Sequence, residues 1–295
     1  MFEKNLLDGE IILVSGGGSG LGLAITGKLM RLGAQLHICG RRKSVLDEAV
    51  AKLTNSIGGK ISAHVVDIRD AASIASMCDA IWSQGGLTGL VNNAAANFIS
   101  PTERLSPRGF DAVASTVMHG TFYLTHEVGR RWIAEKAAGS VLSIVSTGVV
   151  NGAPFVVPST MSKAAVCAMT KSLAIEWGKY GIRLNAVGPG LIPTEGAVAR
   201  LMPSARTEQL RELNPMKRLG TMEELENLVA FMMARGCAWM TGQVVMMDGA
   251  HHLAHGSVYS SMLELDAEEW TGITAQIRAA DARDKAFRTV GTTES

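Results

Sequence analysis

The sequence predicts an α/β fold, a Rossmann-type doubly wound parallel sheet in a single domain followed by a C-terminal helical tail. Short apolar runs alternate with longer helical patterns as far as residue 247. A glycine-rich turn over residues 15–22 lies between the first apolar run and the first helix. Beyond about His251 the alternation ends. We therefore expect a nucleotide-binding domain in residues 1–250 and an extension in residues 251–295 that packs on its own or a neighbouring subunit.

The expected strands are short runs rich in Ile, Val and Leu, as in strands buried on both faces of a parallel sheet. They cover residues 11–14, 35–39, 61–66, 87–91, 141–145, 183–187 and 244–247. Helical patterns follow over residues 21–32, 44–56, 71–82, 106–136, 159–180 and 221–235. The last of these helices begins with a capping box, Thr221 with Glu224.

The tail carries a second capping box, Asp266 with Glu269, before a helix with an apolar face. The side chains on that face are Trp270, Ile273 and Ile277. An exposed apolar stripe would favour aggregation, so we expect it to be buried. His251, His252 and His255 have no carboxylate or thiolate ligand at a fitting spacing, so we expect loop histidines and no metal site.

The composition argues against several classes of protein. Hydrophobic residues make up 47% of the 295 residues, and the net charge of +1 gives no electrostatic case for binding nucleic acid or an anionic membrane. We find no apolar run long enough to span a membrane and no targeting signal. The cysteines lie far apart, at positions 39, 78, 167 and 237. We expect reduced thiols and a cytoplasmic protein.

The first two strands end in features that indicate a dinucleotide site. The spacing Gly16-x-x-x-Gly20-x-Gly22 lets the backbone approach a pyrophosphate at the N-terminus of the first helix. No acidic residue follows the second strand to accept a hydrogen bond from the ribose 2′-hydroxyl of NAD. Arg41, Arg42 and Lys43 stand there instead and favour the 2′-phosphate of NADPH, with a solvated turn as the alternative.

Candidate catalytic side chains follow the fourth and fifth strands. Asn92 comes at a strand end, where it either braces the strand or presents its amide to the cleft. Ser146 follows the fifth strand, and Ser159 and Lys163 are four residues apart on one helix face. A lysine there can bond ribose hydroxyls and lower the pKa of a nearby acid. The alternative is a helix N-cap and a surface lysine.

The glycine turn, residues 92–95, Ser146, Lys163 and Pro189-Gly190 together resemble the short-chain dehydrogenase/reductase superfamily over residues 8–250. That superfamily has a tyrosine as general acid four residues before the lysine, and Ser159 stands in that place. The segments 92–107, 155–159, 171–181 and 218–221 look like those of 2,4-dienoyl-CoA reductases, short-chain enzymes that carry serine at this position. The tail with Trp270 is similar to the end of their mitochondrial branch.

This resemblance implies a homotetramer that uses NADPH to reduce a conjugated dienoyl-CoA thioester to a 3-enoyl thioester in unsaturated fatty acid degradation. The implied cofactor-binding residues are Gly16, Gly18, Ser19, Gly20, Leu21, Gly22, Arg41, Arg42, Asp67, Ile68, Asn93, Lys163, Pro189, Gly190 and Ile192. The implied catalytic residues are Asn97, which would bond the thioester carbonyl, with Ser146, Ser159 and Lys163. The implied substrate contacts are Arg69, Phe98, Ser106 and Arg200.

The proton donor is the position at which the resemblance fails. The mitochondrial branch uses a tyrosine where this chain has Val145, and the peroxisomal branch an aspartate where it has Val117. His119, nearby on the long helix, or water held by Ser146 or Ser159 could supply the proton instead. Two other functions stay open: a carbonyl reductase or alcohol dehydrogenase, and an NADPH-binding interaction protein without turnover.

Overall fold

The structure is a computed structural model that describes residues 2–194, 207–254, 266–269, 271–272 and 275. The chain separates into two compact units, Met1–His252 and Leu253–Ser295. None of the described helices is long and apolar enough to cross a membrane.

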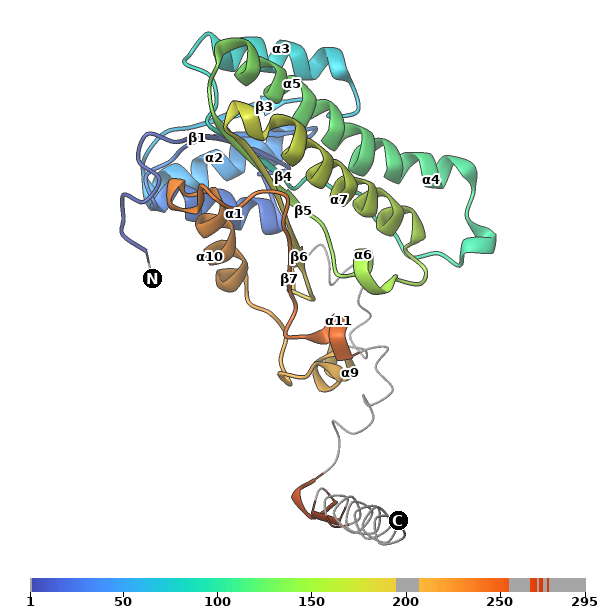
Figure 1. The fold of residues 1–295 in the computed structure, drawn as a ribbon. Helices are drawn as coiled ribbons and strands as arrows, with labels where there is room; N and C mark the ends of the chain where they lie inside the picture. Colours follow the sequence, from blue (N-terminus) through green and yellow to red (C-terminus); the bar gives the residue numbers. More distant parts are fainter. Residues whose placement is uncertain (1, 195–206, 255–265, 270, 273–274, 276–295) are drawn as a thin grey trace, which may run out of the picture. The chain divides into compact units, whose positions relative to one another are not determined.

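A parallel sheet forms the centre of the first unit (Figure 1). Within the described residues it has seven strands in the order β3-β2-β1-β4-β5-β6-β7. The strands are β1 (Ile11–Ser15), β2 (Gln35–Gly40), β3 (Ile61–Val65), β4 (Gly89–Asn92), β5 (Gly139–Ile144), β6 (Ile182–Pro189) and β7 (Val244–Met247). The order reverses between β1 and β4, which is where sheets of this type bind nucleotides. The expected doubly wound fold is confirmed.

Helices cover both faces of the sheet, because the strand side chains alternate between two apolar cores. One core packs against α1 (Gly20–Arg31), α2 (Lys43–Ile57) and α10 (Met222–Met233). The other packs against α3 (Ala71–Trp82), α5 (Gly120–Glu135) and α7 (Val157–Trp177). Figure 1 also labels α4 (Pro107–Ala114), α6 (Gly148–Asn151), α9 (Thr207–Leu213) and α11 (His251–Ala254). In the tail, residues 267–269, 271–272 and 275 are helical as well.

Several expected boundaries are wrong, each for a local reason. The helix expected over residues 106–136 is broken by a π-helical turn, Ser115–His119, between α4 and α5. The fourth strand starts at Gly89 and not at Leu87, since the Leu87 carbonyl accepts a hydrogen bond from the Trp132 indole at 2.5 Å. Proline is favoured in a first helical turn, and α7 begins at Val157, next to Pro158. The pattern does not predict the short helices α6, α9 and α11.

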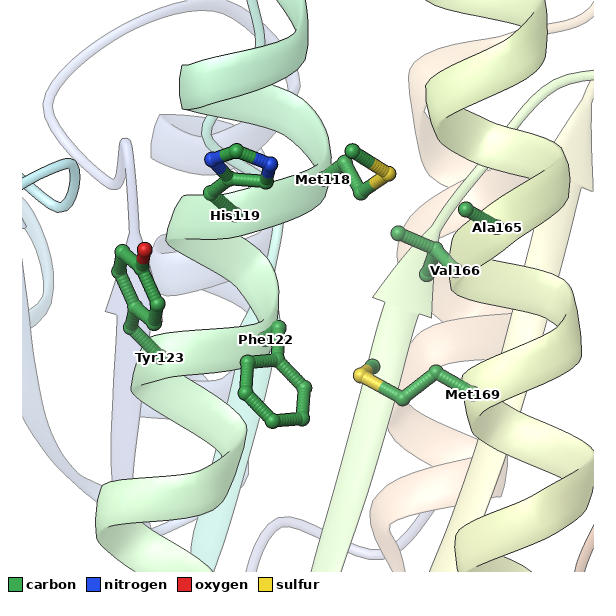
Figure 2. Close-up of a pocket in the computed structure, with 7 residues that line it drawn as sticks. All are labelled: Met118, His119, Phe122, Tyr123, Ala165, Val166 and Met169. Atoms are coloured by element: carbon green, nitrogen blue, oxygen red, sulfur yellow. The ribbon is translucent and has the colours of Figure 1, made fainter.

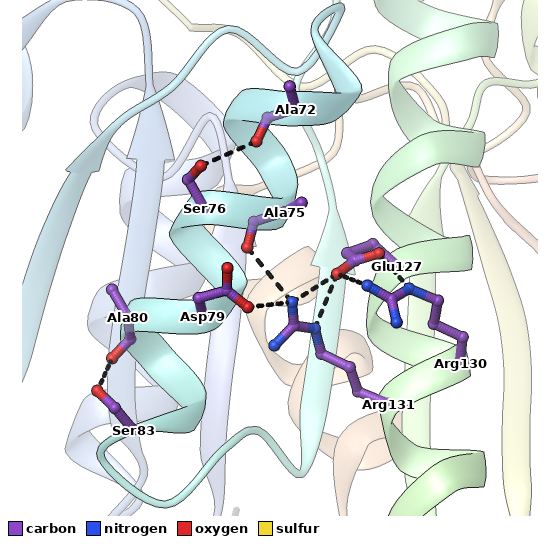
Figure 3. A network of polar contacts seen from close by, with 9 residues as sticks. All are labelled: Ala72, Ala75, Ser76, Asp79, Ala80, Ser83, Glu127, Arg130 and Arg131. Atoms are coloured by element: carbon purple, nitrogen blue, oxygen red, sulfur yellow. Dashed lines mark hydrogen bonds and ion pairs between the residues drawn. The ribbon is translucent and has the colours of Figure 1, made fainter.

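A charged network holds α3 against α5 (Figure 3). Glu127 accepts hydrogen bonds from Arg130 and Arg131, and Arg131 also reaches Asp79 on α3 at 2.7 Å. Burial opposes ionisation of Glu127, but the two guanidinium groups outweigh it and lower the pKa of its carboxyl. The Arg131 guanidinium also lies 5.2 Å from the centre of the Trp82 ring. The network therefore joins two helices that are distant in sequence.

The capping boxes form as the sequence predicts. The Thr221 side chain accepts from the backbone N–H of Glu224, and the Glu224 carboxylate accepts from the Thr221 backbone. In the second unit, Asp266 and Glu269 exchange the same pair of bonds, each at about 2.9 Å or less. Trp270, Ile273 and Ile277 lie outside the described residues.

Candidate nucleotide-binding and active site

The ends of β1, β2 and β4 are bound together at the reversal of strand order. The Ser15 hydroxyl accepts hydrogen bonds from the backbone N–H groups of Asn93 and Ala94 at 3.0 and 3.1 Å. The Asn93 amide donates in return to the carbonyls of Ser15 and Gly16. The Gly16 N–H donates to the Cys39 carbonyl at 2.8 Å. Asn93, a predicted cofactor residue, thus positions the glycine turn.

The glycine turn has the shape of an anion cradle. Gly16 and Gly20 have φ angles of +66° and +53°, which favour glycine. A Cβ on Gly22 would lie 2.2 Å from the Gly16 carbonyl oxygen, so a side chain there would collide with the turn. Ser19 has an extended backbone and makes no side-chain cap, and the first turn of α1 holds no acidic residue. The N–H groups at the start of α1 therefore suit a pyrophosphate.

Gly18 and Leu21 pack the glycine turn against its neighbours. A Cβ on Gly18 would touch Leu46 and Val45 at 3.2 Å, so this turn packs closely on α2. Leu21 is half-buried against the core that lies beneath α1. Both positions fit the nucleotide site that the sequence predicts.

The three cations after β2 behave differently from one another. Lys43 bonds Asp47 at 2.6 Å on the exposed surface of α2. Arg41 and Arg42 are exposed, and their side chains form no hydrogen bond or ion pair within the described residues. Two guanidinium groups thus stand available at the carboxyl end of β2, where a dinucleotide's adenosine ribose lies in this type of fold.

Asp67 and Arg69, assigned by sequence to the adenine and the substrate respectively, bind each other. The Arg69 guanidinium donates to both carboxylate oxygens of Asp67, at distances from 2.5 to 3.0 Å. This bond is the main reason that the pKa of Asp67 is lowered, with a smaller contribution from the charge of Arg41. Ile68 between them is buried against α5, where a Cβ on Gly120 would meet it.

Lys163 lies at the end of β5 beside Ser146. Its ammonium donates to the Val145 carbonyl at 3.2 Å, and Ser146 is the next residue along the chain. Burial lowers the pKa of Lys163 to about 8. Ser159, one turn earlier on α7, is buried too. Lysine has three N–H donors, and the described residues accept from one of them, so donors remain for ribose hydroxyls.

The two asparagines after β4 have different roles. Asn92 is buried, and its amide donates to Thr125 and to Ser143, so it braces the strand end. The Asn97 carbonyl oxygen accepts from the Phe98 backbone at 2.9 Å, which leaves the Asn97 NH₂ group without a bond among the described residues. Asn97 can therefore donate to a ligand. Phe98 is exposed beside it.

Of the remaining predicted substrate contacts, Ser106 has a structural role, because its hydroxyl caps α4 by accepting from the Gly109 backbone at 3.1 Å. Arg200 lies outside the described residues.

The end of β6 meets an Asp–His pair that sequence reasoning missed. The Gly190 N–H donates to the Met247 carbonyl, and a Cβ on Gly190 would lie 2.6 Å from the Asp248 Cβ. The Asp248 carboxylate accepts from both the backbone N–H and the ring Nδ1 of His252, at 2.7 and 2.8 Å. His251 and His252 begin α11, so the expectation of loop histidines is wrong for them.

Two further residues complete this edge. Pro189 is the last residue of β6 and pairs with Met247. Ile192 is buried against Gly220. The described residues contain no group of three or more His, Cys, Asp or Glu that could hold a metal ion.

His119 lies in an apolar pocket between α5 and α7 (Figure 2). Its ring is exposed and lies 6.1 Å from that of Tyr123. The pocket is lined by Met118, His119, Phe122, Tyr123, Ala165, Val166 and Met169. No described contact joins His119 to Ser159 or Lys163. Val117 and Val145, which the resemblance matches to the proton donors of the two dienoyl-CoA reductase branches, are buried.

Comparisons with known proteins agree with this geometry. A family model described as enoyl-(acyl carrier protein) reductase matches residues 16–252. An uncharacterized oxidoreductase of Caenorhabditis elegans is 43% identical over 286 residues, which are 95% of this chain and 91% of the relative. A probable 2,4-dienoyl-CoA reductase of the same organism, described as (3E)-enoyl-CoA-producing, is 41% identical over 292 residues, 97% and 94% of the two chains.

A solved structure extends the match to the fold. The crystal structure of a short chain dehydrogenase from Bacillus anthracis has a TM-score of 0.76 and 35% identity, covering 84% of this chain and 98% of that one. Sequence and fold thus match over most of the chain, and the protein belongs to the short-chain dehydrogenase/reductase family of oxidoreductases, whose fold binds a nicotinamide cofactor.

Proposed function

We propose that the protein is an NADPH-dependent reductase of conjugated enoyl- or dienoyl-CoA thioesters. The observation that carries the proposal is the unpaired Asn97 amide at the sheet edge that also holds Lys163. A neutral N–H donor stabilises charge on a thioester oxygen without losing a proton itself. The relative named as a probable 2,4-dienoyl-CoA reductase supports the same substrate class.

The residues around the glycine turn fit NADPH rather than NADH. The N–H groups at the start of α1 would bind the pyrophosphate, and Arg41 with Arg42 would bind the 2′-phosphate through planar guanidinium groups. The spare N–H bonds of Lys163 would hold the nicotinamide ribose, with Ser159 beside it. When bound, NADPH supplies the hydride.

Reduction of the substrate adds one hydride at the far end of its conjugated system and one proton at a second carbon. As electron density moves to the thioester oxygen, the Asn97 NH₂ group donates a hydrogen bond to it. Ketone reduction is disfavoured, because Ser159 stands where a phenol would protonate an alkoxide and serine is a poor acid at neutral pH.

The experiment follows NADPH absorbance with the purified chain and one acceptor at a time: 2,4-hexadienoyl-CoA, crotonyl-CoA and a panel of ketones. The proposal expects oxidation with the thioesters and none with the ketones. Oxidation of NADPH with a ketone but with neither thioester would contradict the proposal and indicate a carbonyl reductase. Tight NADPH binding without oxidation on any acceptor would favour an interaction protein, which the two valines in the donor positions would explain.

Assembly into a homo-oligomer, with a tetramer as the expected size, belongs to the same proposal. Apolar side chains are exposed on α5 and α7, among them Phe122, Met161 and, at 86% exposed, Ile175. Such a surface favours burial against another chain. Light scattering during size-exclusion chromatography measures the mass, and a monomer would contradict this part of the proposal.

A further inference from the structure

We propose that His252, held in place by Asp248, donates the proton to the reduced substrate. The inference rests on the proposed function, which requires a donor that the sequence positions 117 and 145 do not supply. His252 would be the catalytic residue, and Asp248 would be a positioning residue that acts through the imidazole.

The contacts of Asp248 orient the imidazole ring. A carboxylate only accepts, so Nδ1 of His252 must carry the hydrogen that bridges the 2.8 Å to Asp248. The backbone N–H of His252 donates to the same oxygen at 2.7 Å, which fixes the start of the side chain as well. Nε2 is therefore the nitrogen left for chemistry, and no described residue bonds it. The Asp248 side chain is 2% exposed and that of His252 is 13% exposed.

The pair lies at the same edge of the sheet as Lys163. Met247 pairs with Pro189 across β7 and β6, and Val187 pairs with Ile144 across β6 and β5. Asp248 and Ser146 thus follow the ends of two strands that flank β6 on opposite sides. Neighbouring strands are about 4.8 Å apart, so these two backbones are separated by about 10 Å.

Close backbone packing joins the pair to the loop after β6. Gly190 is bonded to Met247 and so close to Asp248 that a side chain at Gly190 would collide with it. This loop is the one predicted to contact the nicotinamide. The Asp–His pair therefore borders the region in which a substrate would receive the hydride.

Protonation of the reduced substrate requires only the His252 imidazolium and bulk solvent. Once the thioester's conjugated system has received a hydride, the resulting dienolate carries an electron pair and needs one proton. That pair forms a C–H bond with the proton on Nε2 of the His252 imidazolium, and the N–H bond breaks with its electrons left on nitrogen. The neutral imidazole, whose side chain is 13% exposed, is then reprotonated by bulk solvent.

The activity test compares three variants of the full chain with the wild type, using NADPH and 2,4-hexadienoyl-CoA. We expect His252→Gln to lower kcat by about 100-fold to about 10,000-fold while KM and NADPH affinity stay within about 2-fold. Added imidazole should restore part of the rate to His252→Ala. His126→Gln, which alters an exposed histidine on α5, should match the wild type.

Several results would overturn the inference. Full activity of His252→Gln, with an active wild type, would overturn this inference and leave the proposed function intact. A parallel loss of NADPH affinity and kcat in His252→Gln would assign the pair a structural role. No turnover by the wild type would overturn the proposed function together with this inference, so the two failures are distinguishable.

A second measurement needs neither cofactor nor turnover. Nitrogen-15 NMR of the imidazole should find neutral His252 as the Nδ1–H tautomer, and Asp248→Asn should shift the population toward Nε2–H. Finding Nε2–H in the wild type would show that Asp248 does not orient the ring and would contradict the proposal.

Discussion

Replacing Gly22 with alanine should displace the glycine turn and weaken NADPH binding. The new Cβ would lie 2.2 Å from the Gly16 carbonyl oxygen and 2.5 Å from the Asn93 amide nitrogen. Both atoms belong to the bonds that tie β1 to β4, so neither can yield freely. Relief of the contact requires a shift of about 1 Å in the turn or in α1.

The cost can be estimated from other overpacked sites. Forcing an extra methyl into a packed site costs about 1–3 kcal/mol. If that cost falls on the bound geometry of the turn, NADPH affinity drops by about 5-fold to about 150-fold. Gly27→Ala is the matched control in the same helix, since its Cβ would meet only the ends of side chains, Leu53 at 3.1 Å, Ile57 at 3.6 Å and Arg31 at 3.7 Å, and no backbone atom of the turn.

Fluorescence titration with NADPH measures the affinity, and urea unfolding of the free protein measures stability. Gly27→Ala should bind NADPH like the wild type, and its stability should change by about 1 kcal/mol or less, because the helix preference of alanine and the tight contact with Leu53 oppose each other. Gly22→Ala should lose affinity and stability. Equal NADPH affinity for the two variants would refute the assignment of this turn to the pyrophosphate.

The remaining predictions concern a cofactor phosphate and two buried bases. Arg41→Ala should lower the affinity for NADPH by about 10-fold or more and leave the affinity for NADH nearly unchanged, because a charge-assisted hydrogen bond to phosphate is worth roughly 1.5–3 kcal/mol. Equal losses of affinity for the two cofactors in the same titration would exclude a 2′-phosphate contact. Burial lowers the pKa of Lys163 from 10.5 to about 8, so the unfolded chain binds the extra proton between these values. Raising the pH from 8 to 10.5 should therefore stabilise the wild type relative to Lys163→Met in urea unfolding, and a constant difference would contradict this. Burial likewise lowers the pKa of His37 from 6.5 to about 4, and its ring bonds His64 across β2 and β3 at 2.9 Å. The stability of the wild type should therefore fall as the pH drops from 6.5 to 4, and it should fall more than that of His37→Phe. Thermal unfolding at both pH values measures this difference, and an equal loss in the two proteins would contradict the prediction.

The sequence determined the features of this protein that depend on neighbours along the chain. Alternating apolar runs and helical periods predicted the parallel sheet, and Thr221 with Glu224 predicted the start of α10. The glycine spacing predicted the turn after β1, because Gly16 and Gly20 can adopt the positive φ angles of that turn without a steric penalty. Local propensity and backbone sterics act over a few residues and so can be recognised in the chain itself.

Only the tertiary structure decided which partner each polar side chain has. Asn92 turns inward to brace β4, and Asp67 is paired with Arg69, although the sequence left a ligand role open for all of them. Asp248 and His252 are four residues apart in the sequence, but Gly249 and Ala250 between them have positive φ angles, so the two residues do not lie on one regular helical turn. Their contact follows from the turn that these two residues form. Hydrogen bonds and burial depend on atoms that folding brings together from distant segments, and that information is not contained in a local pattern.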